Sequence, residues 1–65
     1  MDFILTVRET EVARLVSEEL CDKQIADALQ ISINTVKNHL RNIREKTNTK
    51  TKIGIAVFYI TKINL

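Results

Sequence analysis

The chain has 65 residues, of which 45% are hydrophobic, with one cysteine, one histidine and no proline. This length allows a single domain with a small core, and one cysteine with one histidine excludes both an internal disulfide and a structural zinc site. The net charge of +2 conceals an asymmetry, because residues 1–22 hold six acids and two bases whereas residues 23–65 hold eight bases and two acids. We therefore expect one domain over residues 1–65, without cofactor or metal, in a reducing cytoplasmic location and with a polyanionic partner.

The first predicted helix covers residues 7–19. Its start is indicated by Thr6-Val7-Arg8-Glu9, a capping box in which the threonine and glutamate side chains each bond the other residue's backbone amide. Apolar residues then follow at helical spacing. At Glu19 no glycine is available to end the helix in a left-handed conformation.

Two further helices are predicted over residues 22–29 and 33–46, with Asp22 and Ser32 as their N-caps. The turn between them is three residues long. This arrangement is typical of a helix-turn-helix, in which one helix braces a second that enters the DNA major groove.

The third predicted helix has one apolar stripe, formed by Val36, Leu40 and Ile43, and a polar face opposite to it. Arginine and lysine suit the edge of guanine in the major groove, and asparagine suits adenine. Asparagine is also a poor helix former, which argues against an ordinary solvated surface. The donors on or beside this face are Asn34, Lys37, Asn38 and Arg41.

The fourth predicted helix covers residues 51–63 and is apolar on two sides. One stripe consists of Ile53, Ala56, Val57 and Ile60, and the other of Ile55, Phe58 and Tyr59. One small body cannot cover both sides, so the surplus face suggests a partner. The apolar run is too short to span a membrane, and we expect no membrane association.

Three blocks of the sequence resemble the LuxR-type (GerE-like) DNA-binding domain. The blocks are Leu5-Thr6-x-Arg8-Glu9-x-Glu11-Val12, Lys23-x-Ile25-Ala26-x-x-Leu29-x-Ile31-Ser32 and Thr35-Val36-Lys37-x-His39-x-x-x-Ile43-x-x-Lys46. The resemblance implies an all-α, four-helix domain of a cytoplasmic, nucleoid-associated bacterial transcription regulator, often a response regulator. It also implies a homodimer bound to double-stranded DNA, an additional receiver or ligand-sensing domain, and RNA polymerase as a further partner.

Transferred by position, the resemblance implies three sets of residues. The DNA bases would be contacted by Lys37, Asn38 and Arg41, with Asn34 beside them. The phosphates would be contacted by Lys23, Thr35, His39, Lys46 and Lys52. The dimer interface would contain Ile55, Phe58, Tyr59 and Lys62.

The chain departs from the family pattern in four places. Glu19 replaces a glycine, so the first helix is expected to end differently. Thr47-Asn48-Thr49 replaces Leu-Gly-Val, which removes two apolar residues beside the core. Lys52 replaces an arginine and loses bidentate geometry, and Gly54 replaces a longer polar residue, which permits close helix approach.

Two other functions fit parts of the pattern. The fourth region of a bacterial sigma factor shares the braced helix pair, although His39 and the apolar fourth helix fit the LuxR type better. A protein-interaction module of the same fold could dock through its fourth helix. No nucleophile with a base, paired carboxylates or phosphate loop is present in the sequence, so we expect no enzymatic activity.

Overall fold

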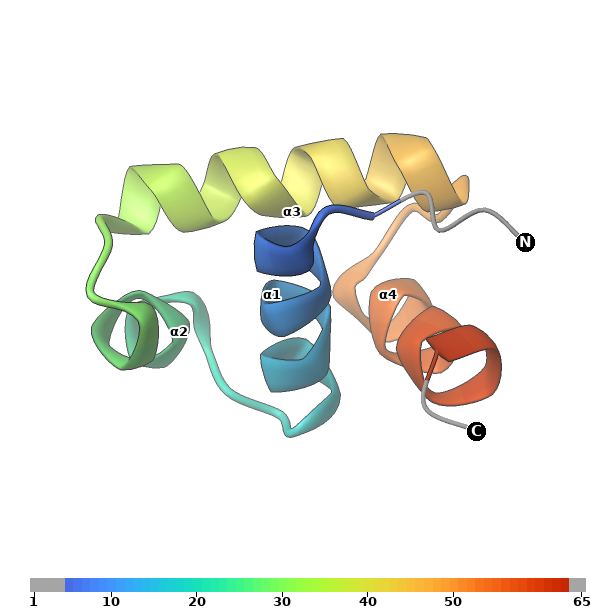
Figure 1. Ribbon diagram of the computed structural model, residues 1–65, viewed down its shortest axis with the longest axis horizontal. Helices are drawn as coiled ribbons and strands as arrows, with labels where there is room; N and C mark the ends of the chain where they lie inside the picture. The colour runs from blue at the N-terminus through green and yellow to red at the C-terminus, as the bar shows by residue number, and fades with distance from the viewer. Residues whose placement is uncertain (1–4, 64–65) are drawn as a thin grey trace.

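Four helices and a short π-helical segment make up residues 5–63, the part of the chain that the computed structural model describes (Figure 1). The elements are α1 (Val7–Ser17), α2 (Asp22–Leu29), α3 (Ile33–Thr47), α4 (Lys52–Phe58) and the π-helical segment η1 (Tyr59–Ile63). In Figure 1, α3 runs along the top of the molecule, α1 lies below it, and α2 and α4 lie on either side of α1. The predicted all-α, four-helix fold is confirmed.

The core lies where α1 meets the other three helices. Each of the four helices contributes at least one side chain with no solvent exposure, and these residues are Val12, Ala13, Ile25, Val36, Ile43 and Ile55. The stripe predicted for α3 is confirmed, because Leu40 is also buried beside Val36 and Ile43. Ala26 is nearly fully buried on α2 as well. The inner side of α3 is thus fixed by packing.

The starts of three helices have the side-chain caps typical of their sequences. At α1 the capping box is confirmed, since the Thr6 amide donates to Glu9 Oε1 over 3.0 Å and the Glu9 amide donates to Thr6 Oγ1 over 3.1 Å. Ser32 Oγ accepts from the Thr35 amide over 3.0 Å at the start of α3. Thr51 Oγ1 accepts from the backbone amide of Gly54 over 3.0 Å at α4.

The predicted cap of α2 is wrong by one residue. Cys21 occupies the N-cap position and Asp22 is the first helical residue. The physical reason is that Gln24 Oε1 reaches back to accept from the Cys21 amide over 2.9 Å. The Asp22 carboxylate is consequently available for an ion pair with Lys52 of α4.

The end of α1 differs from the prediction in two ways. The helix ends at Ser17, not at residue 19, and Glu19 adopts a left-handed conformation with φ of 67°. Backbone bonds then close the turn, from the Glu19 amide to Val16 over 3.0 Å and from the Leu20 amide to Leu15 over 3.3 Å. The expectation that the helix must end without a left-handed residue is therefore wrong. A residue other than glycine in this conformation costs on the order of 1 kcal/mol.

We expect Glu19→Gly to raise the free energy of unfolding. Glycine adopts a positive φ without steric cost, and this relief exceeds the entropy that glycine adds to the unfolded chain. The expected gain is about 0.5–1 kcal/mol. Urea unfolding followed by circular dichroism measures it, with Glu19→Ala as the control that removes the charge but keeps the strain. Equal stability of the two variants would contradict the explanation.

Polar contacts stabilise the loop after α3, at the positions where the family pattern has apolar residues that this chain lacks. Thr47 Oγ1 donates to the Ile43 carbonyl over 2.8 Å and lies 3.0 Å from Thr49 Oγ1. A Cβ atom added at Gly54 would lie 2.9 Å from Thr49 Cβ, closer than side-chain carbons normally approach. The missing side chain of Gly54 thus lets Thr49 pack on α4, so these two departures from the family pattern fit each other.

The fourth helix was predicted over residues 51–63, but its α-helical part covers only Lys52–Phe58 before the π-helical segment begins. The Thr61 hydroxyl donates to the Val57 carbonyl over 2.8 Å. A side chain that bonds this carbonyl competes with the backbone amide four residues on, which favours the wider π-helical turn.

The apolar side of α4 that faces the core includes residues that the resemblance assigned to a dimer interface. Ile55 is completely buried, and Phe58 and Tyr59 pack against the core. The expected place of Ile55 in a dimer interface is therefore wrong, because it has no surface to offer. The exposed apolar side chains of this helical region are Ile53, Val57 and Ile60.

Candidate nucleic-acid interface

The outer side of α3 is the candidate recognition surface. Asn34, Lys37, Asn38 and Arg41 are all exposed, on the side of the helix away from its buried stripe. None of the four side chains takes part in a hydrogen bond or ion pair with the described residues. In Figure 1 the outer side of α3 forms the upper edge of the molecule, with no other described element above it. The donors are therefore accessible to a large ligand.

The start of α3 adds hydroxyl and amide groups to this surface. Thr35 is half-buried, and its Oγ1 lies 2.9 Å from Ser32 Oγ. The first backbone amides of a helix have no partner within the helix and favour an anion. His39 is also half-buried, one turn farther along, between the outer side and the buried stripe.

The lysines implied to contact phosphates are all engaged in ion pairs. Lys23 lies 3.3 Å from Asp27 in an exposed pair on α2, which contributes little to stability. Lys46 at the end of α3 lies 2.8 Å from Glu9 of α1, and Lys52 at the start of α4 pairs with Asp22 of α2. Lys46 therefore also connects α3 to α1, and Lys52 connects α4 to α2.

Glu9 is the one buried charged residue of the described chain, with 4% of its surface exposed. Burial raises the pKa of its carboxyl group. Hydrogen bonds from the Lys46 ammonium and the Thr6 amide, together with attraction to the Lys46 charge, outweigh burial, and the pKa lies below its ordinary value. The carboxylate is thus ionised in the fold and links the start of α1 to the end of α3.

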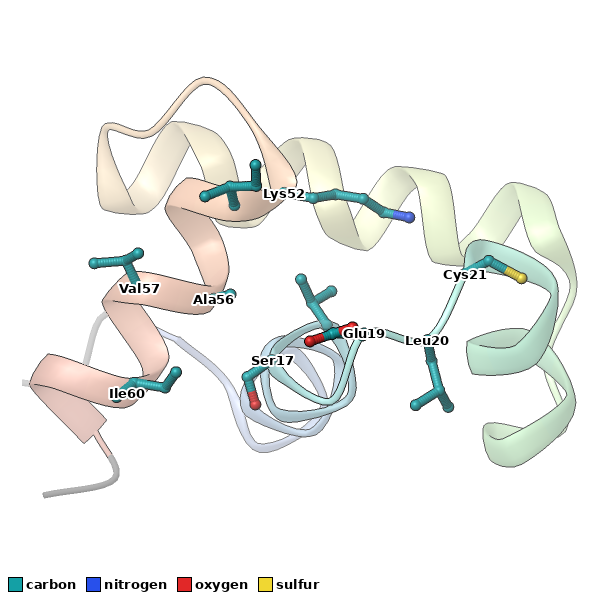
Figure 2. Close-up of a pocket in the computed structure, with 10 residues that line it drawn as sticks. Ser17, Glu19, Leu20, Cys21, Lys52, Ala56, Val57 and Ile60 are labelled. Atoms are coloured by element: carbon teal, nitrogen blue, oxygen red, sulfur yellow. The ribbon is translucent and has the colours of Figure 1, made fainter.

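An apolar groove of about 580 Å³ lies on another side of the molecule, between α4 and the end of α1. Figure 2 shows Ala56 of α4 and Ile60 of η1 on one side of this groove, and Ser17 of α1 on the other. Lys52 extends along its edge toward Cys21. The exposed residues Ile53 and Val57 continue the apolar surface along α4.

Comparison with known protein families assigns the fold and its exposed helix. Residues 3–59 match the family model GerE, described as bacterial regulatory proteins of the luxR family. The chain belongs to the LuxR family. This family comprises DNA-binding transcription regulators and has a non-enzymatic fold, so the predicted resemblance and the prediction that the domain is not an enzyme are both confirmed. The match also favours the LuxR type over a sigma-factor region.

Several response regulators are similar to the LuxR domain of this chain. The nitrate/nitrite response regulator protein NarP of Escherichia coli K12 is 37% identical over 57 residues, which cover 88% of this chain and 26% of NarP. The transcriptional regulatory protein DegU of Brevibacillus brevis is 45% identical over 54 residues, which cover 83% of this chain and 23% of DegU. The chain thus spans about a quarter of the length of these curated relatives.

No solved structure matches the chain significantly. None of the helices in residues 5–63 is long and apolar enough to cross a membrane. In the same residues, no group of three or more histidine, cysteine, aspartate or glutamate side chains is placed to hold a metal ion.

Two features of the LuxR domain were missed by sequence reasoning. The ion pair between Glu9 and Lys46 joins residues 37 positions apart, and helical periodicity carries no information on such a contact. Arg44 was interpreted only as a cation near the end of a helix, although it lines a groove beside the recognition surface with Lys37 and Arg41. The spacing of these three residues on one helix was the signal that could have found it.

Proposed function

We propose that this domain binds double-stranded DNA sequence-specifically, as a dimer, with α3 in the major groove. The observation that supports this proposal is the uncovered row of donors on α3, formed by Asn34, Lys37, Asn38 and Arg41. Membership of the LuxR family supports DNA binding and transcription regulation in general.

The dimensions and rigidity of α3 suit this role. A helix of 15 residues is about 22 Å long, and the major groove, about 12 Å wide, admits an α-helix. The buried residues Val36, Leu40 and Ile43 hold its inner side against the core. The donors therefore project from a fixed backbone, so little backbone conformational entropy is lost when they contact base edges.

Phosphate contacts would position the domain on the duplex. Lys23 at the start of α2 and Thr35 at the start of α3 lie near helix N-termini, where backbone amides also favour phosphate. His39, Lys46 and Lys52 remain predicted contacts of the same kind. Each phosphate contact releases counterions, so we expect the affinity to fall steeply with salt.

Selection of duplexes from a random pool by the purified chain, followed by titration of the enriched sequences at several salt concentrations, tests this function. We expect an enriched inverted repeat whose binding exceeds that of random duplex. Equal affinity for every duplex would contradict sequence-specific recognition. Self-association without any DNA binding would instead support the protein-interaction module.

We further propose that the homodimer forms through the exposed apolar side of α4 and η1, which consists of Ile53 and Val57 of α4 and Ile60 of η1. These side chains are 77%, 53% and 51% exposed, and the apolar groove beside α1 continues the same surface. Phe58 and Tyr59 pack against the core and would contribute at most the margin of the interface, with Lys62. Burial of such a surface in a pair of copies is favourable by about 25 cal/mol per Å² of apolar area.

We expect Val57→Glu to abolish cooperative binding to an inverted repeat while a single half-site is still bound. The reason is that two carboxylates would be buried without partners in the proposed interface. Gel-shift titration on one-site and two-site duplexes measures this, and sedimentation gives the stoichiometry. Ala28→Glu is the matched control, since it adds the same charge at an exposed position on α2. Undiminished cooperativity of Val57→Glu would exclude this interface.

A further inference from the structure

The cations of the described chain fall into two groups. Five of them have a carboxylate within 4 Å, and these are Arg8, Arg14, Lys23, Lys46 and Lys52. The other five have no ion-pair partner among residues 5–63, and these are Lys37, Arg41, Arg44, Lys50 and Lys62. Three of them, Lys37, Arg41 and Arg44, line a single groove of about 430 Å³. Their positive charge is therefore not offset by a partner in the fold.

The groove has α3 as one wall and the starts of α2 and α4 as the other. Lys37, Arg41 and Arg44 are spaced by four and three residues, so they follow one side of α3 over about 10 Å. Asp22 of α2 and Lys52 of α4 complete the lining. The carboxylate of Asp22 is already paired with Lys52, so the groove retains a net positive charge.

Arg44 differs from its two neighbours in this groove. Lys37 and Arg41 are exposed, whereas Arg44 is half-buried and lies between the apolar stripe and the outer side of α3. Arg44 lies one turn from Leu40, and both residues line the groove. Beside such apolar surface an anion is attracted more strongly than in open water. Arg44 lies at the edge of the recognition surface. This location suits a contact with the DNA backbone better than a contact with base edges in the middle of the major groove.

We propose that this groove binds a backbone phosphate of the DNA, with Arg44 as its guanidinium donor. The inference rests on the proposed DNA binding and adds a residue to it. A guanidinium presents parallel N–H groups that match two phosphate oxygens. The pair of Asp22 and Lys52 holds the opposite wall in place and leaves the charge of Arg44 to the phosphate.

Binding of Arg44→Gln to the selected duplex and to random duplex, at several salt concentrations, tests this inference. We expect weaker binding on both, with the slope of log affinity against log salt reduced in magnitude by about 1. Arg14→Gln is the matched control, because it removes the same charge from the exposed side of α1. Arg44→Lys should retain the slope and lose affinity only in part. Circular dichroism checks that each variant is folded.

A duplex with one phosphate at a time replaced by methylphosphonate locates the contact. We expect one position at which neutralisation weakens the wild-type chain but has no effect on Arg44→Gln. Loss of preference at a single base pair in Arg44→Gln would overturn the phosphate assignment, as would a salt slope equal to that of Arg14→Gln. If the wild-type chain binds no duplex, the proposed function is wrong. If the wild-type chain binds and Arg44→Gln binds with the same affinity and salt slope, only the inference about Arg44 is wrong.

Discussion

Arg41→Ala should reduce the preference of the domain for its selected site by about 5-fold to 150-fold over a duplex with one altered base pair. The reason is that a good base contact contributes about 1–3 kcal/mol of discrimination. Arg41 is exposed on the outer side of α3, and its side chain makes no hydrogen bond or ion pair with the described residues. Its removal should therefore leave the stability of the domain unchanged. Competition titration with single-substitution duplexes measures the effect position by position.

Lys23→Ala is the comparison that separates base reading from phosphate binding. Lys23 is exposed near the start of α2, and its pair with Asp27 is solvent-exposed. We expect its loss to weaken binding to all duplexes alike and to lower the magnitude of the salt slope by about 1. If Arg41→Ala and Lys23→Ala both lower affinity uniformly, the division between base-reading and phosphate-binding residues is wrong.

Lys46→Met should lower the free energy of unfolding at neutral pH by about 1–2 kcal/mol, since it leaves the buried carboxylate of Glu9 without its charged partner. The Thr6 amide still donates to Glu9 in this variant, and the wild-type ammonium is partly exposed to solvent, which keeps the expected loss moderate. Urea unfolding at pH 7 measures it. Lys50→Met is the control, because Lys50 is exposed and has no ion-pair partner among the described residues.

The same pair predicts a pH dependence whose sign follows from the pKa of Glu9. In the fold this pKa lies below its ordinary value of 4.5, so the carboxylate stabilises the fold above that pH. The contribution is lost as the pH falls through the folded-state pKa. We expect the stabilities of the wild-type chain and Lys46→Met to converge under acid conditions, where Glu9 is protonated in both. A constant difference from pH 7 to acid would show that the pair contributes through packing alone.

Local features of the fold were predictable because their causes lie within a few residues. The capping box of Thr6 and Glu9 and the apolar spacing of Val36, Leu40 and Ile43 define their helices from sequence alone. The exposed donors of α3 followed from the same spacing, since a residue opposite a buried stripe faces solvent.

Features that depend on how helices meet were not predictable. The fourth helix has two apolar sides of similar strength, and only its approach to α1 decides that Ile55 is buried and Val57 is exposed. Likewise, the link from Lys46 to Glu9 requires the end of α3 to lie beside the start of α1. The left-handed conformation of Glu19 was missed because residue preference argued against it and backbone bonds overrode that preference.

The outer side of α3 holds no part of the architecture together, since the side chains of Asn34, Lys37, Asn38 and Arg41 make no hydrogen bond or ion pair with the described residues. Substitutions there should alter which operator is chosen at almost no cost in folding. Stability and binding preference are thus free to change independently of each other. A scaffold of this kind can acquire new target sequences by single steps, each of which passes through a folded intermediate.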